Sequence, residues 1–527
     1  MVWRILSSAS PGVDFTRFRE SIFDPLLMFA TMRQLRQLRL SVLWATLALM
    51  LVPATNVPSQ ILPDLGDASQ AVVSPAQERK LGEAAMRQIH ASGAYLDDPE
   101  VEAYLNTLGQ RLAAQIAGPH PDFEFFAIAD PAINAFALPG GFVAVHTGLI
   151  LLTQSESELA GVMAHEISHV TQHHIVRAIA TQQKNDLVTL GAMLLGILAA
   201  RSRPDMANAT IAGSQALNVQ LAINYTREHE LEADRIGFQL LDKAGFDTRG
   251  MPAMFERLQR VMRPYDDNNI QRYQRTHPIT SERIADALNR SETRPYRQVP
   301  DSREFHFVRA LIRSYQGDTA RDAITDFESS LAEHKYNDEG ATRYGLVAAL
   351  LRDKQFPKAA LELAKLEKSS PPHPMIEAVA GQLLIQSGQL PAAIRRYQAA
   401  LQRYPTHMQL VYDYPDALIQ SGQHAQAIQF IEGQLVRLPN DARLHQLAAQ
   451  SYAALGKKMQ QHAHQGEYYA RIGNLRGAID QFESAIKAGD GNFYQISTAE
   501  SRLRTLKQEL ADQGKEFGKL AARSGLR

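Results

Sequence analysis

Two histidines and a glutamate lie at a spacing that suits metal-assisted hydrolysis. His165 and His169 stand four residues apart in the segment HEISH, so on a helix their rings lie one turn apart on the same face and can reach one ion. Glu166 lies about 100° further round such a helix, beside the ion, where it can accept a proton from an attacking water. Chance produces such a pentapeptide in roughly a few per cent of chains of this length. The motif therefore predicts a metal-dependent peptide hydrolase, to be weighed against the rest of the chain.

A second acidic segment supplies a candidate for the remaining ligand. A tetrahedral catalytic zinc site takes three protein ligands and leaves its fourth position to water. Glu230 is the candidate for the third ligand, and Asp234 follows it by about one turn on the same helical face, where it is expected to orient a ligating histidine. We exclude Glu232 and Glu228 as ligands, because residues two positions from Glu230 point to another side of the helix. The alternative interpretation of this segment is a solvated, charged helix face.

The HEISH segment is expected to lie in the middle of a clamped helix. Ser155 followed three residues later by Glu158 is the pattern of a capping box and predicts the helix start, and the apolar residues that follow would bury one face. Upstream, residues 77–92 and 99–116 are expected to form two further helices.

Two strands are expected between these helices and the motif. Residues 123–130 (FEFFAIAD) alternate and are rich in aromatic side chains, which is typical of a strand. The turn signal at residues 139–141 (PGG) then leads into a second strand. If that second strand is an edge of the sheet, its main chain would align an extended substrate by pairing with it. Its residues are Phe142, Val143, Ala144, Val145 and His146.

The C-terminal part of the sequence is repetitive. Beyond about Asp301, alanine-rich helical segments recur, and Gly388, Gly422 and Gly456 are separated by 34 residues each. A 34-residue period of paired helices is typical of tetratricopeptide repeats, which stack into a superhelix with a concave binding surface. About five repeats are expected, with a register shift where Gly473 follows Gly456 after half a period. Small side chains at Ala393 and Ala427 would let paired helices approach, while Tyr397 and Leu401 fill the seam, and residues 500–511 would form a polar capping helix.

The first residues have the character of a targeting signal. Arg33, Arg36 and Arg39 precede residues 41–52, a mostly apolar run that is too short to span a bilayer. Export through a cleaved signal is expected, and an uncleaved signal anchor is the alternative. A second apolar run, residues 187–200, is also too short to span; it is either a buried core helix or a flap that contacts a membrane or a hydrophobic substrate.

Composition limits the remaining choices. A chain of 527 residues with 45% hydrophobic and 21% charged residues is expected to hold more than one globular domain. A formal net charge of −1 leaves no electrostatic footprint for nucleic acid. The absence of cysteine excludes disulfides, cysteine-ligated zinc and thiol catalysis.

Taken together, these segments resemble a known family. HEISHVTQHH at residues 165–174 and ELEADRIG at 230–237 resemble the HExxH and ExxxAD motifs of the gluzincin metallopeptidases, a family that includes the CAAX prenyl protease and HtpX. Residues 133–149 (INAFALPGGFVAVHTGL), 246–251 (FDTRGM) and 276–290 (THPITSERIADALNR) further resemble the branch of periplasmic proteases that enhance β-barrel assembly. The resemblance extends from about Leu62 to the C-terminus; it is specific in the peptidase segments and general in the repeats.

The resemblance implies roles for individual residues. It implies one Zn²⁺ per chain, held by His165, His169 and Glu230, with Glu166 as general base and acid. It also implies that His277 approaches the metal as a regulatory fourth ligand. On the bare sequence, His277 before a proline fits an ordinary loop histidine equally well, and His173, four residues after His169, is interpreted as a surface residue or an outer neighbour of the site.

The expected protein is mainly α-helical: a zincin-like α+β metallopeptidase domain with a small sheet, followed by an α-solenoid of tetratricopeptide repeats. The expected boundaries are 1–58 for the N-terminal extension and signal, 59–297 for the peptidase and 298–527 for the repeats. The expected function is a zinc endopeptidase and chaperone-like factor of the periplasm that degrades misassembled outer-membrane β-barrel proteins and assists their assembly. Barrel-assembly machinery would dock in the repeat groove. The alternative is a latent peptidase that acts mainly as a repeat scaffold; membrane-embedded prenyl-protein processing is excluded, because no segment after the signal is long enough to span.

Overall fold

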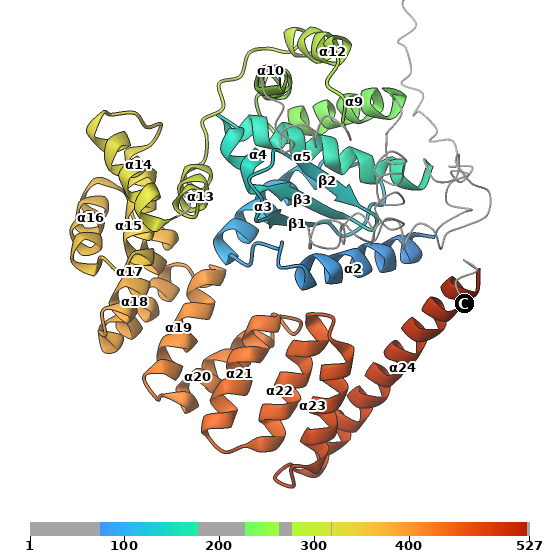
Figure 1. Cartoon of the computed structure of the whole chain (residues 1–527), viewed down its shortest axis with the longest axis vertical. Coiled ribbons are helices and arrows are strands. Elements are labelled where there is room, and N and C mark those ends of the chain that lie inside the picture. The colour runs from blue at the N-terminus through green and yellow to red at the C-terminus, as the bar shows by residue number, and fades with distance from the viewer. Residues whose placement is uncertain (1–73, 178–226, 263–276, 318, 524–527) are drawn as a thin grey trace, which may run out of the picture. The chain divides into compact units, whose positions relative to one another are not determined.

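The computed structural model of the chain describes residues 74–177, 227–262, 277–317 and 319–523 (Figure 1). The predicted signal sequence and the apolar run at 187–200 lie outside the described residues, so both interpretations stay predictions. Within the described ranges, no helix combines the length and the apolar character that crossing a bilayer requires.

A three-stranded sheet lies at the centre of the part that precedes the helical repeats. Its strands are β1 (Glu124–Ile128), β2 (Ala135–Leu138) and β3 (Phe142–His146), in the order β1-β3-β2. β3 runs parallel to β1 and antiparallel to β2. Gly140 and Gly141 have φ of +80° and +98°, which glycine adopts without strain, and they close the hairpin between β2 and β3.

The sheet corrects two of the sequence predictions. Residues 135–138 form a strand where only the approach to a turn was predicted. The proposal that Phe142–His146 aligns the substrate is wrong in its premise, because β3 is hydrogen-bonded on both sides and its main chain is already paired. Both β1 and β2 are edge strands, but the outer edge of β1 is partly occupied by a bridge between Tyr95 and Ile128 and by Asn106, which hydrogen-bonds the main chain of Phe125. Within the described residues, the outer edge of β2 is therefore the more open one to an extended chain.

Helices cover both faces of the sheet. Along β3, Phe142 and Ala144 pack with side chains of α2, whereas Val143 and Val145 belong to the core shared with α3 and α5. The helices of this part are α2 (Pro75–Ala91), α3 (Pro99–Ala113), α4 (Thr147–Leu152), α5 (Glu156–Thr171), α9 (Arg227–Lys243), α10 (Gly250–Met262) and α12 (Ser281–Glu292).

The motif helix α5 begins where the sequence predicts. The Ser155 hydroxyl accepts a hydrogen bond from the backbone N–H of Glu158. The reciprocal bond of a capping box is not made, since the Glu158 carboxylate accepts instead from the backbone N–H of Gln154 at 2.7 Å and pairs with Arg257 at 2.9 Å. Nearly every residue of α5 is buried, so this helix is held on all sides.

The rest of the described chain is a succession of paired helices. α17, α19 and α21 begin 34 residues apart, as do their partners α18, α20 and α22. Within a pair, a small residue on one helix faces a large side chain on the other. A side chain at Gly381, for example, would collide with the Tyr397 ring. The helices are α13 (Arg303–Ser314), α14 (Ala320–Ala332), α15 (Glu339–Arg352), α16 (Phe356–Ser369), α17 (Pro374–Gln386), α18 (Leu390–Arg403), α19 (Met408–Gln420), α20 (His424–Leu435), α21 (Ala442–Ala454), α22 (Lys458–Arg471), α23 (Leu475–Lys487) and α24 (Phe493–Arg523).

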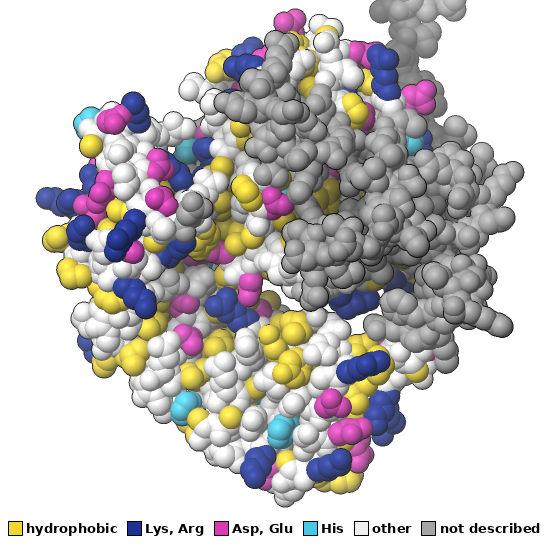
Figure 2. Space-filling view, in the orientation of Figure 1, with side chains coloured by type: hydrophobic (Ala, Val, Ile, Leu, Met, Phe, Trp, Pro, Cys, Tyr) yellow, Lys and Arg dark blue, Asp and Glu magenta, His cyan; other side chains and the backbone are white. Residues whose placement is uncertain are grey.

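The repeat register shifts at α22, near the predicted position. Gly466 on α22 faces Phe482 on α23 in the same way that Gly381 faces Tyr397, sixteen residues on in both cases. The helix α22 therefore closes one repeat and opens the next. On the face shown in Figure 2, basic and acidic side chains are interspersed rather than gathered by sign. The mainly helical fold with a small sheet and a helical-repeat part confirms the predicted fold class, while the predicted domain boundaries stay predictions.

Candidate metal centre

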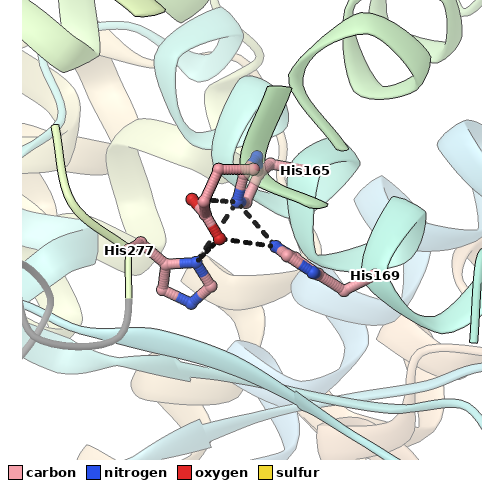
Figure 3. Close-up of side chains that lie close together, drawn as sticks. His165, His169 and His277 are labelled. Carbon is pink, nitrogen blue, oxygen red and sulfur yellow. Dashed lines mark hydrogen bonds and ion pairs between the residues drawn. The ribbon is translucent and has the colours of Figure 1, made fainter. Parts of the chain in front are cut away.

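Four buried side chains converge on one point between α5, α9 and the segment that precedes α12 (Figure 3). α5 supplies His165 and His169, α9 supplies Glu230, and His277 comes from the segment before α12. One ligand atom from each lies within 4.8 Å of the others, and all four side chains are buried. This is the one such group of His, Cys, Asp and Glu among the residues that the structure describes.

The spacing of these atoms fits a tetrahedral cation. The His165 Nε2 atom lies 2.9 Å from His169 Nε2 and 3.3 Å from His277 Nδ1. The Glu230 carboxylate lies 3.5 Å from His165 Nε2, 3.3 Å from His169 Nε2 and 3.1 Å from His277 Nδ1. Ligands about 2.05 Å from a zinc ion at tetrahedral angles are separated by about 3.3 Å. The residues present therefore fit zinc in both donor type and geometry.

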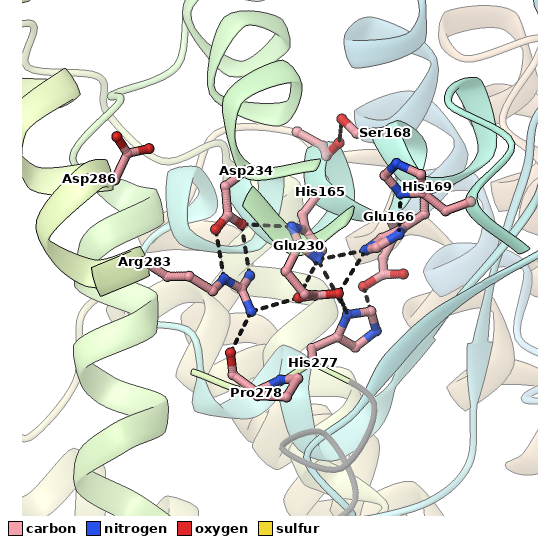
Figure 4. A network of polar contacts seen from close by, with 12 residues as sticks. His165, Glu166, Ser168, His169, Glu230, Asp234, His277, Pro278, Arg283 and Asp286 are labelled. Atoms are coloured by element: carbon pink, nitrogen blue, oxygen red, sulfur yellow. Dashed lines mark hydrogen bonds and ion pairs between the residues drawn. The ribbon is translucent and has the colours of Figure 1, made fainter. Parts of the chain in front are cut away.

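Glu166 lies beside this cluster rather than in it. Its side chain is fully buried, and its Oε1 atom is 3.6 Å from Nε2 of His277 (Figure 4). Neither carboxylate oxygen of Glu166 has a hydrogen-bond partner. Its position beside the cation site suits a group that accepts a proton from a water bound there.

Asp234 and Arg283 support the ligands from the outside (Figure 4). The Asp234 Oδ1 atom lies 2.9 Å from His165 Nδ1, on the ring edge opposite the cluster. Arg283 donates to Asp234 through Nε at 2.6 Å and through Nη2 at 2.7 Å, and its Nη1 lies 2.6 Å from Glu230. The same Nη1 donates to the Pro278 carbonyl at 2.9 Å, which ties down the residue after His277. Sequence reasoning missed Arg283; the only signal was its place in the THPITSERIADALNR segment.

The charges of the cluster act strongly on one another. Burial lowers the pKa of His165, but the Glu230 and Asp234 carboxylates outweigh it and raise that pKa to about 10. Burial raises the pKa of Glu230, yet His277 and His165 hold it well below its usual range. Burial also lowers the pKa of His169 well below normal. The carboxylates of Glu230 and Asp234 thus favour positive charge at the centre of the cluster. A divalent cation bound there would supply it.

The two histidines after the motif have different surroundings. His173 turns to α2, where its Nδ1 lies 3.0 Å from the Glu78 carboxylate, away from the cluster. His174, which sequence reasoning passed over, is fully buried and contacts His169 and Glu232. Glu232 lies outside the ligand cluster, as expected.

Comparison with known proteins gives a consistent result. The profile described as Peptidase family M48 matches residues 99–291, and a tetratricopeptide-repeat profile matches residues 384–451. The chain is 30% identical over 489 residues to the beta-barrel assembly-enhancing protease of Escherichia coli (strain K12), an overlap of 93% of this chain and 100% of the relative. It is 31% identical over 434 residues to the protein of the same name from Yersinia pestis, 81% of this chain and 88% of the relative.

A more distant relative matches the peptidase part alone. The mitochondrial metalloendopeptidase OMA1 of Arabidopsis thaliana is 32% identical over 161 residues, which is 31% of this chain and 30% of that protein. The sequence resemblance is thereby confirmed in both its peptidase and its repeat parts. The chain belongs to peptidase family M48, as a metallopeptidase that carries C-terminal tetratricopeptide repeats.

Proposed function

We propose that the chain is a zinc endopeptidase in which His165, His169 and Glu230 hold the ion and Glu166 moves the proton. The observation that carries this proposal is the convergence of four buried ligand atoms at separations that suit zinc, with the Glu166 carboxylate beside them. A zinc ion held there supplies a Lewis acid that lowers the pKa of water and polarises a peptide carbonyl. Glu166 accepts the proton of the attacking water and passes it to the leaving amine. Asp234 fixes the orientation of the His165 ring by contacting the Nδ1 atom of that ring.

We propose that an extended substrate is aligned along β2 in place of β3. The outer edge of β2 offers main-chain groups to a strand-like segment, and such pairing favours unfolded or loop segments over folded proteins. This preference fits substrates that have failed to fold.

The cellular role that we propose is quality control of outer-membrane β-barrel proteins in the periplasm, by degrading misassembled chains and assisting assembly. Its support is the name of the relatives that match over most of their length, together with the basic and apolar segments near the N-terminus. The helical repeats are suited to holding such substrates or the barrel-assembly machinery in their groove.

A latent peptidase that works mainly as a repeat scaffold is the second candidate, and one observation favours it. His277 contributes a fourth protein ligand atom to the cluster, and four protein ligands complete a tetrahedral shell without a place for water. We propose that His277 keeps the enzyme at rest and must leave for cleavage to begin.

Digestion of casein and of an unfolded outer-membrane barrel protein by the full chain separates these functions. The wild type should cleave both, a chelator should stop cleavage, and Glu166→Gln should bind zinc normally but cleave at least about a hundredfold more slowly, since a general base contributes about that much or more. Undiminished cleavage by Glu166→Gln would refute the assignment of the base. Binding of the barrel protein without cleavage, by the wild type and by His277→Ala alike, would favour the scaffold.

A further inference from the structure

His174 folds back onto the metal cluster because the motif helix stops just before it. α5 ends at Thr171, and His173 adopts a left-handed conformation with φ of +50°. In an uninterrupted helix, a residue five positions after His169 would lie about 140° round the axis. The turn at His173 instead brings the buried His174 ring to His169, with their Nδ1 atoms 2.9 Å apart.

The other edge of the His174 ring meets a carboxylate from α9. Nε2 of His174 lies 3.0 Å from Oε2 of Glu232, and the same oxygen accepts from Nη1 of Arg177 at 3.0 Å. The His229 ring stacks on His174 with centroids 4.5 Å apart and fixes the plane of its ring. Both nitrogens of His174 therefore have a defined partner.

This chain of contacts has one consistent arrangement of protons. When Nε2 of His169 faces a cation, its Nδ1 carries the hydrogen and donates to Nδ1 of His174. His174 then carries its own hydrogen on Nε2 and donates it to Glu232. The Glu232 carboxylate thus selects the tautomer of His174, which in turn selects the tautomer and ring orientation of His169.

We propose that His174 and Glu232 are positioning residues that orient His169 for zinc. Asp234 orients His165 by direct contact, whereas Glu232 acts on His169 through His174. The inference rests on the proposed zinc site and extends it to residues outside the ligand cluster. It also gives a role to Glu232, which was excluded as a ligand. The Glu232 side chain is 38% exposed, so the series of contacts from His169 through His174 connects the buried site to a carboxylate near the surface.

The test measures the zinc affinity of the full chain by competition with a chromogenic chelator. His174→Leu removes both contacts and should weaken zinc binding about 10- to 100-fold, the usual cost of losing a partner of a metal ligand. His174→Gln should restore most of the affinity, because its amide oxygen can accept from His169 while its NH₂ donates to Glu232. Glu232→Ala removes the acceptor for His174 and should fall at the weaker end of that range, about tenfold.

The control is His173→Asn, which keeps a residue type tolerant of the left-handed turn and should bind zinc like the wild type. The visible spectrum of the Co²⁺-loaded protein reports ligand geometry and should change in His174→Leu but not in His174→Gln. If His174→Leu fails to fold, Glu232→Ala decides, since the Glu232 side chain is half-buried and its removal leaves the core intact. Wild-type affinity in His174→Leu or in Glu232→Ala would overturn this inference alone, whereas a wild-type chain that binds no zinc would overturn the proposed function as well.

Discussion

Replacing Arg283 by methionine should destabilise the protein by an amount that depends on zinc. Arg283 is 1% exposed and faces two buried carboxylates, with contacts of 2.6 and 2.7 Å to Asp234 and 2.6 Å to Glu230. Methionine keeps an unbranched apolar stem like that of arginine but leaves both carboxylates without this cation. Removing one partner of a buried ion pair costs about 3–5 kcal/mol.

The size of the loss should shrink when zinc is bound. Without zinc, the positive charge nearest to Glu230 and Asp234 after the substitution is the His165 imidazolium, whose pKa is raised to about 10 by those same carboxylates. Zinc brings two charges to the same point and so replaces part of what Arg283 supplied. The substitution should therefore cost the zinc-saturated protein less than the chelator-treated one.

Thermal unfolding with chelator and with saturating zinc measures both effects. At about 2–4 °C per kcal/mol for a part of this size, the midpoint of Arg283→Met should fall by about 6–20 °C in chelator. Arg290→Met is the matched control on the same helix: its partner Asp286 lies 2.8 Å away, but both side chains are about one-third exposed, and such pairs contribute about 0–1 kcal/mol. An Arg283→Met midpoint that matches Arg290→Met, or a deficit that zinc leaves unchanged, would refute the argument.

Three further outcomes are expected. His277→Ala should keep zinc bound through the three remaining ligands and cleave casein faster than the wild type; slower cleavage at full zinc occupancy would contradict a closing role. Gly237→Leu should lower zinc affinity, because a side chain there meets the backbone of α5 at about 3.0 Å from the His165 nitrogen and would push α9 away, whereas Gly433→Leu, which meets nothing within 4 Å, should not. Asp413→Asn should raise the unfolding midpoint more at pH 8 than at pH 5. Burial raises the Asp413 pKa to about 7, so this carboxyl group ionises less readily in the folded protein than in the unfolded chain. The resulting loss of folding free energy is about 2–3 kcal/mol larger at pH 8 than at pH 5. Equal shifts at the two pH values would show that Asp413 is not held protonated.

The features that depend on local periodicity could be predicted from the sequence. The placement of His165 and His169 one turn apart on the same face follows from helical geometry once Ser155 has started the helix, and both are found in α5. The 34-residue period predicts helix pairs because each repeat has the same small and large residues at its seam. These signals lie within a few residues of one another, or recur, so a single sequence contains them in full.

The features that depend on long-range contacts were decided by the tertiary structure. The position of β3 in the middle of the sheet results from pairing with two strands at once, which the alternation within Phe142–His146 does not encode. Arg283 reaches Asp234 and Glu230 only because α12 packs beside α9. That His174 rather than His173 contacts His169 depends on the left-handed conformation of His173 just after α5. This conformation turns the backbone, so the position of His174 does not follow from helical spacing. Spacing along a helix thus predicted the pair His165 and His169 and the pair Glu230 and Asp234, whereas packing between helices brought the two pairs together and placed Arg283 against the second.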